Sequence, residues 1–286
     1  MRVAISGMFW DQPTVGSGQY LHGLLDALAR VAPQHEYVLL LPSYPLDARR
    51  SNVQTFERSN VRTLVVQTPF DGRSENLAKL WYEQVGVPLA AARLRADLLH
   101  VPYFAPPLWS PAPVVATVLD IIPLLLPEYR GGAAVRAYMR LVALAARRAA
   151  HVIAISDDSR RAIVARLGCA PGRVTTIPLA AGAQYQPLAR AAACARAAAR
   201  YGLRGPFVYY VGGLDTRKNV ETLLRAWAWL RRAGGPPATL AIAGRALGRD
   251  PRLFPDLDAL IAALGIQGSV ARIDVPHADN ALLYNA

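Results

Sequence analysis

Lysine and cysteine are scarce in this sequence. Only Lys79 and Lys218 are lysines among 32 basic residues, so arginine carries nearly all of the positive charge. Cys169 and Cys194 form neither a C-x-x-C pair nor a zinc-like spacing with histidine, which argues against a disulfide framework and a zinc site. Two isolated cysteines are typical of a reducing compartment, and we expect the protein in the cytoplasm.

Long apolar runs are also missing. No stretch reaches the roughly 18 uninterrupted apolar residues that a spanning helix needs. The alanine-rich stretch 133–150 comes closest, but arginines at positions 136, 140, 147 and 148 interrupt it. Residues 1–6 are typical of a strand and lack the apolar core of a signal peptide. We therefore expect a globular protein with neither a spanning helix nor a secretory leader.

Acidic residues are too few to balance the arginines, and the net charge is +12. Residues 1–190 hold 20 basic and 13 acidic residues (+7), and the remainder holds 12 and 7 (+5), so the excess is spread along the chain. An anionic substrate, an anionic membrane surface or nucleic acid would each be attracted, and a merely basic surface is also open. Nucleic acid is the weakest alternative, because no nucleic-acid-binding motif is present.

What is present is an alternation of short apolar runs with helix-patterned segments. The runs are rich in Val, Ile and Leu with little polar alternation, which is typical of parallel strands buried on both faces. The expected strands are 2–6, 37–41, 63–66, 97–101, 114–119, 151–155, 174–179, 207–211, 239–243 and 270–275. The expected helices are 19–32, 76–94, 133–150, 156–167, 189–201, 219–232 and 255–264. The pattern predicts an α/β fold with doubly wound sheets.

The length of 286 residues suggests two domains. The alternation of strands and helices breaks at 186–203, where Pro187 precedes an alanine- and arginine-rich helix. We therefore predict an N-terminal domain over 1–190 and a second α/β domain over 191–286.

Ligands of open α/β sheets collect at the carboxyl ends of the strands, so the strand-to-helix turns hold the candidate site residues. The first is Gly16-Ser-Gly18, where backbone N–H groups at a helix start could approach a phosphate. A dinucleotide fingerprint needs a third glycine where Leu21 stands, which disfavours an NAD(P)-dependent oxidoreductase. A simple glycine-rich loop stays open as the alternative.

Asp120 closes an apolar strand, and a carboxylate there costs desolvation unless it is used or paired. It is either a functional acid, with Glu128 as a conceivable partner, or a structural cap of the loop. Ser156-Asp157-Asp158, by contrast, is explained as the capped start of a helix.

Arg217 and Lys218 lie between a strand that ends in Gly212-Gly213 and a following helix. Cations at a helix N-terminus oppose the helix dipole, so this like-signed cluster is costly unless it shares an anion. A diphosphate would satisfy both side chains and the free N–H groups. A solvated basic turn is the alternative. The five histidines are scattered and predict no metal site.

In series, these turns resemble the retaining glycosyltransferases of family 4, which have the GT-B fold of two Rossmann-like domains. The segments that carry the resemblance are Gly16-Ser-Gly18-Gln-Tyr20, Asp120-Ile-Ile-Pro123, Pro127-Glu-Tyr129, Ala149-Ala-His-Val-Ile-Ala-Ile-Ser156, Thr176-Ile-Pro-Leu179, Val211-Gly-Gly-Leu-Asp-Thr-Arg217-Lys218-Asn219, Leu240-Ala-Ile-Ala-Gly244 and Leu282-Leu-Tyr-Asn-Ala286.

The resemblance implies transfer of a hexose, with retention and without a metal ion or other cofactor, from a nucleotide-diphosphate sugar to a glycan or lipid-linked acceptor. The N-terminal domain would receive the acceptor and the second domain the donor. Catalytic roles are implied for Asp120, Arg217 and Lys218, the two cations stabilising the departing diphosphate. Donor contacts are implied for Gly16, Gly18, Gly213, Arg217, Lys218, Asp274 and Val275.

The sequence departs from the family pattern in three places. Leu119 stands where the family's His-Asp pair has histidine, and Ala180 stands where a glycine is usual. The chain stops at Ala286, before the family's E-x-F-G motif. We therefore expect a fragment with an incomplete second domain, weak or absent activity and a tendency to aggregate. A nucleotide-sugar-binding protein without catalytic activity is the alternative function. Peripheral contact with an anionic membrane, at its inner face, is a further expectation, and nucleic acid is not an expected partner.

Overall fold

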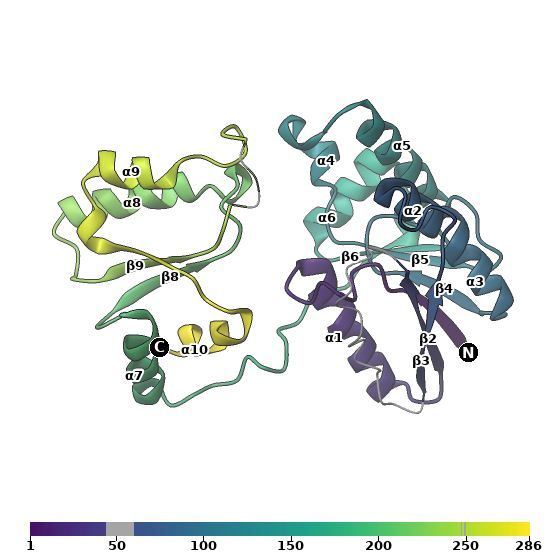
Figure 1. Cartoon of the computed structure of the whole chain (residues 1–286), viewed down its shortest axis with the longest axis horizontal. Helices are drawn as coiled ribbons and strands as arrows, with labels where there is room; N and C mark the ends of the chain where they lie inside the picture. The colour runs from purple at the N-terminus through teal and green to yellow at the C-terminus, as the bar shows by residue number, and fades with distance from the viewer. Residues whose placement is uncertain (44–59, 247, 249) are drawn as a thin grey trace. The chain divides into compact units, whose positions relative to one another are not determined.

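The computed structural model describes residues 1–43, 60–246, 248 and 250–286. They form two compact units, Met1–Ala180 and Ala181–Ala286 (Figure 1). The division falls before the boundary at 190 that the sequence suggested, because the segment ahead of the helix packs on unit 2. The Tyr185 ring meets the Tyr284 ring edge-on with centroids 5.8 Å apart, and the Leu188 N–H donates to Asn285 Oδ1 at 2.8 Å.

Unit 1 is built on a seven-stranded sheet in the order β3-β2-β1-β4-β5-β6-β7, and all of its neighbouring strands run parallel. Every run predicted as a strand in this unit forms one. The strands are β1 (Arg2–Ser6), β2 (Glu36–Pro42), β3 (Val61–Val66), β4 (Leu98–Val101), β5 (Val114–Val118), β6 (His151–Ala154) and β7 (Val174–Thr176).

Helices cover both faces of this sheet (Figure 1). They are α1 (Gly16–Val31), α2 (Glu75–Trp81), α3 (Val87–Arg93), α4 (Ile122–Leu125), α5 (Ala133–Arg148) and α6 (Asp157–Ala162). Alternate residues of β1 separate the two cores: Val3 and Ile5 pack with Leu21 and Leu25 of α1, whereas Ala4 belongs to the core under α2, α3 and α5. The predicted α/β fold with strands buried on both faces is confirmed.

The single helix predicted over 76–94 is interrupted by a π-helical turn, Tyr82–Gly86. The Val87 N–H donates to the Tyr82 carbonyl, five residues back, and Pro88 has no N–H with which to restore the α-helical pattern. The helix expected over 156–167 likewise ends in a π turn, Ile163–Leu167. Its start is as predicted, because the Ser156 hydroxyl accepts from the Ser159 N–H at 3.1 Å.

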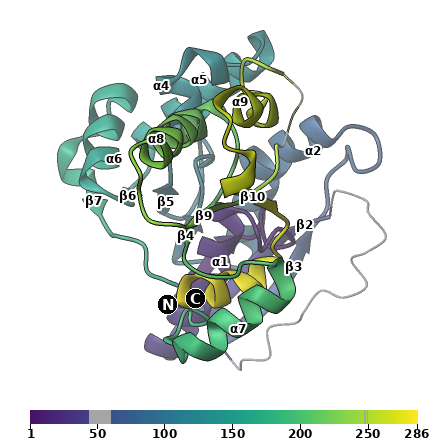
Figure 2. The same cartoon turned by 90° about the vertical axis from the view of Figure 1, so that its left-hand side faces the viewer.

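Unit 2 repeats the same construction on a smaller scale. Its three parallel strands, β8 (Phe207–Val211), β9 (Thr239–Ala243) and β10 (Val270–Ile273), lie in the order β10-β9-β8. Two helices, α8 (Val220–Arg232) and α9 (Leu257–Leu264), cover one face, and α7 (Arg190–Tyr201) and α10 (Asn280–Asn285) lie side by side on the other (Figures 1 and 2).

The helices of the described residues include none long and apolar enough to cross a membrane.

A free sheet edge distinguishes β8 from its counterpart in unit 1. Within the described residues β8 pairs only with β9, whereas β1 lies between β2 and β4. Val208 and Val211 of β8 are 46% and 37% exposed, while β1 is buried beyond its first residue. An exposed apolar strand edge is a template for pairing with another chain.

Replacing Val208 with lysine is expected to reduce self-association of the purified chain, because a charge on a free strand edge opposes edge-to-edge pairing. Light scattering against protein concentration measures the effect. Val31→Lys is the matched control, since Val31 ends α1 and is 77% exposed. Equal reduction in both variants would show that net charge, and not the β8 edge, governs the association.

A buried glutamate lies under the sheet of unit 1. Glu83, in the π turn, has a fully buried side chain, and burial raises its pKa to about 7. Its Oε2 accepts from the Tyr138 hydroxyl at 2.7 Å, and Lys79 Nζ lies 3.8 Å from Oε1, which has no hydrogen-bond partner. Lys79 also lies 4.6 Å from the centre of the Tyr138 ring. This carboxyl therefore costs stability whenever it is ionised.

The folded state holds the Glu83 proton more tightly than the unfolded state, where the pKa is near 4.5, so the free energy of unfolding is expected to fall as the pH rises from 4.5 to about 7. Glu83→Gln is expected to flatten this dependence and to stabilise the chain at about pH 8 by on the order of 3 kcal/mol. Chemical denaturation across this pH range is the measurement. Glu75→Gln, on the exposed start of α2, is the control, and an unchanged slope in Glu83→Gln would contradict the assignment.

Candidate functional site

The carboxyl ends of the three parallel strands of unit 2 meet at one edge of its sheet. Gly213, Arg217 and Lys218 follow β8, and Asp274 and Val275 follow β10. The structure therefore brings these five predicted residues to a common edge, where open α/β sheets bind their ligands.

Two glycines let the turns after β8 and β9 approach each other closely. Gly212 and Gly244 have φ of +155° and +156°, a region that side chains disfavour. A Cβ on Gly244 would lie 2.1 Å from the Gly212 carbonyl oxygen, so no larger residue fits. The backbone of both turns is consequently bare at this edge, as close contact with a ligand requires.

Arg217 and Lys218 lie in a single 3₁₀ turn, Thr216–Lys218, between β8 and α8. The sequence suggested that this like-signed pair is costly unless it shares an anion. Arg217 has such an anion within the chain. Its Nε lies 3.3 Å from Oδ1 of Asp215, which is almost buried. Arg217 is thus held in place and partly neutralised.

Lys218 differs from its neighbour. Its ammonium group forms no ion pair with any residue that the structure describes. A Cβ added to Gly213 would lie 4.0 Å from Lys218 Cγ, so the lysine stem lies beside the bare glycine backbone. Lys218 is therefore the cation of this turn that is available to an anion.

The start of α8 is also open to an anion. Asn219, just before the helix, is in the left-handed conformation with φ of +51°. Its side-chain oxygen accepts from the Thr222 hydroxyl at 2.8 Å, and no side-chain bond caps the helix N–H groups. Uncapped N–H groups and the positive end of the helix dipole thus follow Lys218 directly in the chain.

Sequence reasoning missed two charged residues at this edge, Asp215 and Arg245. Arg245 follows Gly244 directly and forms an ion pair with Asp274, both side chains being about three-quarters exposed (74% and 71%). The sequence does carry a signal for Arg245. This cation follows a glycine at the end of β9, as Arg217 and Lys218 follow Gly212-Gly213 after β8.

The remaining candidates lie at the carboxyl edge of the sheet of unit 1. Gly16 is the first residue of α1, with no atom within 4 Å of a Cβ placed on it. Gly18 is buried, and a Cβ there would lie 1.9 Å from the Gln12 carbonyl oxygen. Packing of the loop alone therefore explains Gly18, whereas Gly16 is accessible.

Asp120 follows β5 and is exposed, and its Oδ1 accepts from the Ile122 N–H at 3.1 Å. This contact caps the one-turn helix α4. Glu128, the suggested partner, is exposed in a separate 3₁₀ turn, Pro127–Tyr129. The carboxylate of Asp120 keeps a free oxygen at the same edge as Gly16.

A buried polar chain supports this edge of unit 1 and was not anticipated. His100 Nε2 lies 2.9 Å from Thr117 Oγ1, which lies 3.1 Å from the Tyr20 hydroxyl. Burial lowers the pKa of His100 to about 4, so the imidazole is neutral near pH 7, and burial raises the pKa of Tyr20. The chain ties α1 to β4 and β5 and fixes the helix that begins at Gly16.

No group of three His, Cys, Asp or Glu residues in the described ranges is arranged to hold a metal ion.

Solved structures share this fold across the whole chain. Sucrose-phosphate synthase from Thermosynechococcus elongatus matches with a TM-score of 0.66 and 18% identity, over 100% of this chain and 73% of its own. The Anabaena protein HepE, in complex with UDP and glucose, matches with a TM-score of 0.67 and 18% identity, over 100% and 72%. A glycosyltransferase from Rickettsia africae matches with a TM-score of 0.63 and 12% identity, over 99% and 70%. The fold is therefore of the GT-B type.

No curated protein matches the sequence. The family model described as Glycosyltransferase Family 4 matches residues 15–181, which is more than half of the chain and includes Gly16, Gly18 and Asp120. The chain belongs to glycosyltransferase family 4.

Proposed function

We propose that this protein transfers a hexose from a UDP-sugar to an acceptor with retention of configuration, and that the carboxyl edge of unit 2 binds the donor diphosphate. The observation that carries the proposal is Lys218, a cation without an ion-pair partner in the described chain, beside the bare Gly213 backbone and the uncapped start of α8. HepE was crystallised with UDP-glucose, which supports a UDP-sugar as the donor.

Lys218 and Arg217 would contact different phosphates of the donor. In retaining transfer the bond from the anomeric carbon to the diphosphate breaks, and negative charge grows on the leaving oxygen. Lys218 supplies a full positive charge to that oxygen, and α8 supplies N–H groups. Arg217, oriented by Asp215, presents its remaining N–H donors to the second phosphate. These groups would neutralise the leaving group without a metal ion.

At the far end of the donor, Asp274 and Val275 are proposed to contact the nucleoside. Asp274 reaches the edge already paired with Arg245. This pair can reorganise when a ligand arrives, because both side chains are exposed and a surface ion pair contributes little stability.

Unit 1 is proposed to receive a glycan or lipid-linked acceptor. Gly16 presents an open backbone at its carboxyl edge, and Asp120 a carboxylate. Gly18 keeps the loop compact enough for that approach. The cytoplasm is the proposed compartment, supported by Cys169 and Cys194, which are both free thiols.

A second candidate is a nucleotide-sugar-binding protein without catalytic activity. Two observations favour it: Leu119 precedes Asp120 where the family pattern has histidine, and Asp120 is engaged in capping Ile122. Both candidates would bind the donor. Only the transferase would release free UDP when an acceptor is present.

Lys218→Gln is expected to weaken UDP binding by tenfold or more, because a charge-assisted bond to phosphate contributes about 1.5–3 kcal/mol. Isothermal titration with UDP measures it. Arg217→Ala is expected to weaken binding too, but it also removes the ion pair with Asp215, so Lys218→Gln is the cleaner test.

Arg232→Gln is the matched control, because it removes one charge from the last turn of α8, at the opposite end of that helix. UDP affinity is expected to stay within a factor of about two of the unaltered chain, as for a distant surface charge. Equal affinities of Lys218→Gln and the unaltered chain would show that the turn is only solvated surface.

A further inference from the structure

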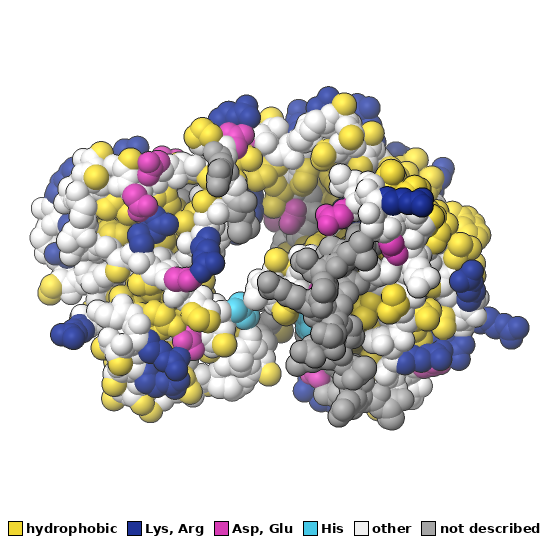
Figure 3. Space-filling view, viewed as in Figure 1, with side chains coloured by type: hydrophobic (Ala, Val, Ile, Leu, Met, Phe, Trp, Pro, Cys, Tyr) yellow, Lys and Arg dark blue, Asp and Glu magenta, His cyan; other side chains and the backbone are white. Residues whose placement is uncertain are grey.

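A buried acid in unit 1 has no part in the transfer reaction as proposed above. Lys, Arg, Asp and Glu side chains are spread over the molecular surface, as Figure 3 shows for one face. Among the acidic and basic residues that the structure describes, Glu83 is the most deeply buried, at 1% exposed. Side chains from three elements face its carboxyl group: Lys79 of α2, Tyr138 of α5 and Tyr103 of the loop between β4 and β5. A change of charge at Glu83 is therefore felt first by these three side chains.

Tyr103 connects Glu83 to the carboxyl end of β1. Burial raises the pKa of Glu83, and the facing Tyr103 hydroxyl opposes that rise. Burial, followed by the charge of Glu83, raises the pKa of Tyr103. The Tyr103 hydroxyl oxygen also lies 3.1 Å from Oγ of Ser6, the last residue of β1. Tyr103 therefore faces the carboxyl group of Glu83 and the hydroxyl group of Ser6 with the same oxygen.

Ser6 continues this connection to Tyr82 and Gly7. Ser6 Oγ lies 3.3 Å from the Tyr82 hydroxyl oxygen. The Tyr82 hydroxyl donates its proton to the Leu40 carbonyl, and its oxygen accepts from the Gly7 N–H at 3.2 Å. We call the hydroxyl groups of Tyr103, Ser6 and Tyr82 the hydroxyl line. All three side chains are buried, so they depend on one another and on nearby protein groups for their hydrogen bonds.

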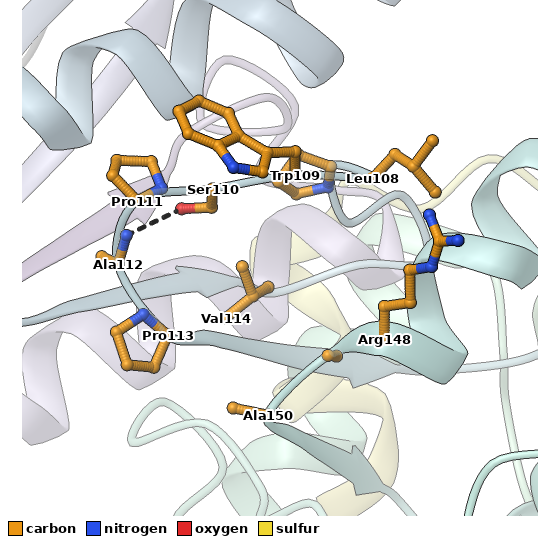
Figure 4. A pocket seen from close by; sticks show the side chains of 11 residues that line it. Leu108, Trp109, Ser110, Pro111, Ala112, Pro113, Val114, Arg148 and Ala150 are labelled. Carbon is orange, nitrogen blue, oxygen red and sulfur yellow. Dashed lines mark hydrogen bonds between the residues drawn. The ribbon is translucent and has the colours of Figure 1, made fainter.

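The loop that carries Tyr103 is held in place by the residue next to Glu83. Gln84 Nε2 donates to the Pro106 carbonyl at 3.3 Å, and Gln84 Oε1 accepts from the Leu108 N–H at 3.0 Å. From there the same loop forms one wall of a cavity at the amino end of β5 (Figure 4). Because Gln84 tethers the loop on both sides of this point, we expect a change at Glu83 to reach Tyr103 as a turn of its hydroxyl group.

Residues 7–15, which we call the Gly7 loop, lead from β1 directly into α1 at Gly16. Backbone hydrogen bonds of 3.0, 3.1 and 3.2 Å form three successive turns along this loop. The Phe9 ring within it meets the Tyr103 ring edge-on, with centroids 5.2 Å apart. Tyr103 thus contacts the Gly7 loop with its ring and reaches the start of the same loop through the hydroxyl line.

We propose that Glu83 is a positioning residue: gain or loss of its proton reverses the hydroxyl line and changes the hydrogen bonding of the Gly7 N–H. Ser6 has one hydroxyl proton and two acceptors, the oxygens of Tyr103 and Tyr82. When Glu83 is ionised, Tyr103 donates its proton toward the carboxylate and accepts from Ser6. The Tyr82 oxygen then loses Ser6 as a donor and keeps the Gly7 N–H.

Protonation of Glu83 produces the opposite direction. The proton is held on Oε1, which has no hydrogen-bond partner among the described residues, and is donated to the Tyr103 oxygen. Tyr103 then donates to Ser6, and Ser6 donates to the Tyr82 oxygen, where it competes with the Gly7 N–H. One proton taken up at Glu83 is thus felt at the start of the Gly7 loop, and no other bond is made or broken.

The consequence for transfer rests on the proposed function, in which Gly16 presents an open backbone to the acceptor. Burial raises the pKa of Glu83 to about 7, so the Gly7 loop changes state near neutral pH. The KM for the acceptor is therefore expected to change between about pH 6 and pH 8, and to become insensitive to pH over this range in Glu83→Gln. UDP affinity at each pH is expected to be the same in Glu83→Gln and the unaltered chain, because the donor binds unit 2.

The test is the backbone amide signal of Gly7, followed by NMR across the pH range in protein that carries isotope-labelled serine and glycine. In the sequence only Gly7 and Gly18 follow a serine, so selection of Ser-Gly amide groups isolates two signals. The Gly7 signal is expected to titrate with a midpoint near pH 7. A parallel shift at Gly18 is expected as the change reaches α1, and a stationary Gly18 signal would refute the consequence for the acceptor.

Three variants interrupt the connection at successive points, and one control leaves it intact. Glu83→Gln is expected to abolish the titration of the Gly7 signal. Tyr103→Phe and Ser6→Ala are expected to abolish it too, while the pH dependence of unfolding, which belongs to Glu83, persists in both. Tyr20→Phe is the matched control, because it removes a hydroxyl from the separate polar chain that ties α1 to β4 and β5. Its Gly7 signal is expected to titrate as in the unaltered chain.

A Gly7 signal that does not move around pH 7 in the unaltered chain would overturn the proposal. Titration that survives in Glu83→Gln would overturn it as well, because another group would be the source. Survival in Tyr103→Phe and Ser6→Ala would show that the charge acts through space and not along the hydroxyl line. Equal loss in Tyr20→Phe would show that any missing hydroxyl suffices. Failure of UDP to bind would refute the proposed function alone, since the Gly7 signal is measured without UDP.

Discussion

The parallel direction of the strands is the constraint on which the rest of the structure depends. Because neighbouring strands in each unit's sheet run the same way, their carboxyl ends share one edge and their helices must cross back over the faces. Turns that are far apart in sequence, such as those at Gly213 after β8 and Asp274 after β10, consequently lie at the same edge, on either side of the turn after β9. The same rule places Gly16 and Asp120 at one edge of the sheet of unit 1. Position in the sheet thus assembles the candidate site residues of each unit before any side chain is considered.

The sequence predicted this framework well, because it rests on short-range regularities. Continuous Val, Ile and Leu runs mark strands buried on both faces, and each predicted strand is present, although β7 and β10 end a few residues early. The capped helix start at Ser156 was also predictable, because the contact spans three residues. The strand pattern placed Gly213, Arg217 and Lys218 at the carboxyl end of β8, whereas Asp274 and Val275 were implied only by the family resemblance and fell inside the strand expected at 270–275.

What the sequence could not predict depends on contacts between distant residues. The pairing of Arg217 with Asp215 needs the conformation of one turn, and the reason for Gly18 needs the position of Gln12. The environment of the buried Glu83 depends on α5, which brings the Tyr138 hydroxyl within hydrogen-bond distance of its carboxylate. The link from His100 through Thr117 to Tyr20 joins three elements. None of these contacts leaves a periodic signal in the sequence.

The rarity of lysine acquires a physical meaning from these contacts. Arginine's delocalised charge is weakly hydrated and spreads over a fork of donors, so one side chain can serve several acceptors. An ammonium group is a compact point charge that a single partner can saturate. Lys79 has one such partner in the buried Glu83, and Lys218 lies beside the Gly213 backbone, where we propose that a phosphate binds. The two lysines therefore lie where one compact partner is present or proposed, and arginine carries the rest of the positive charge.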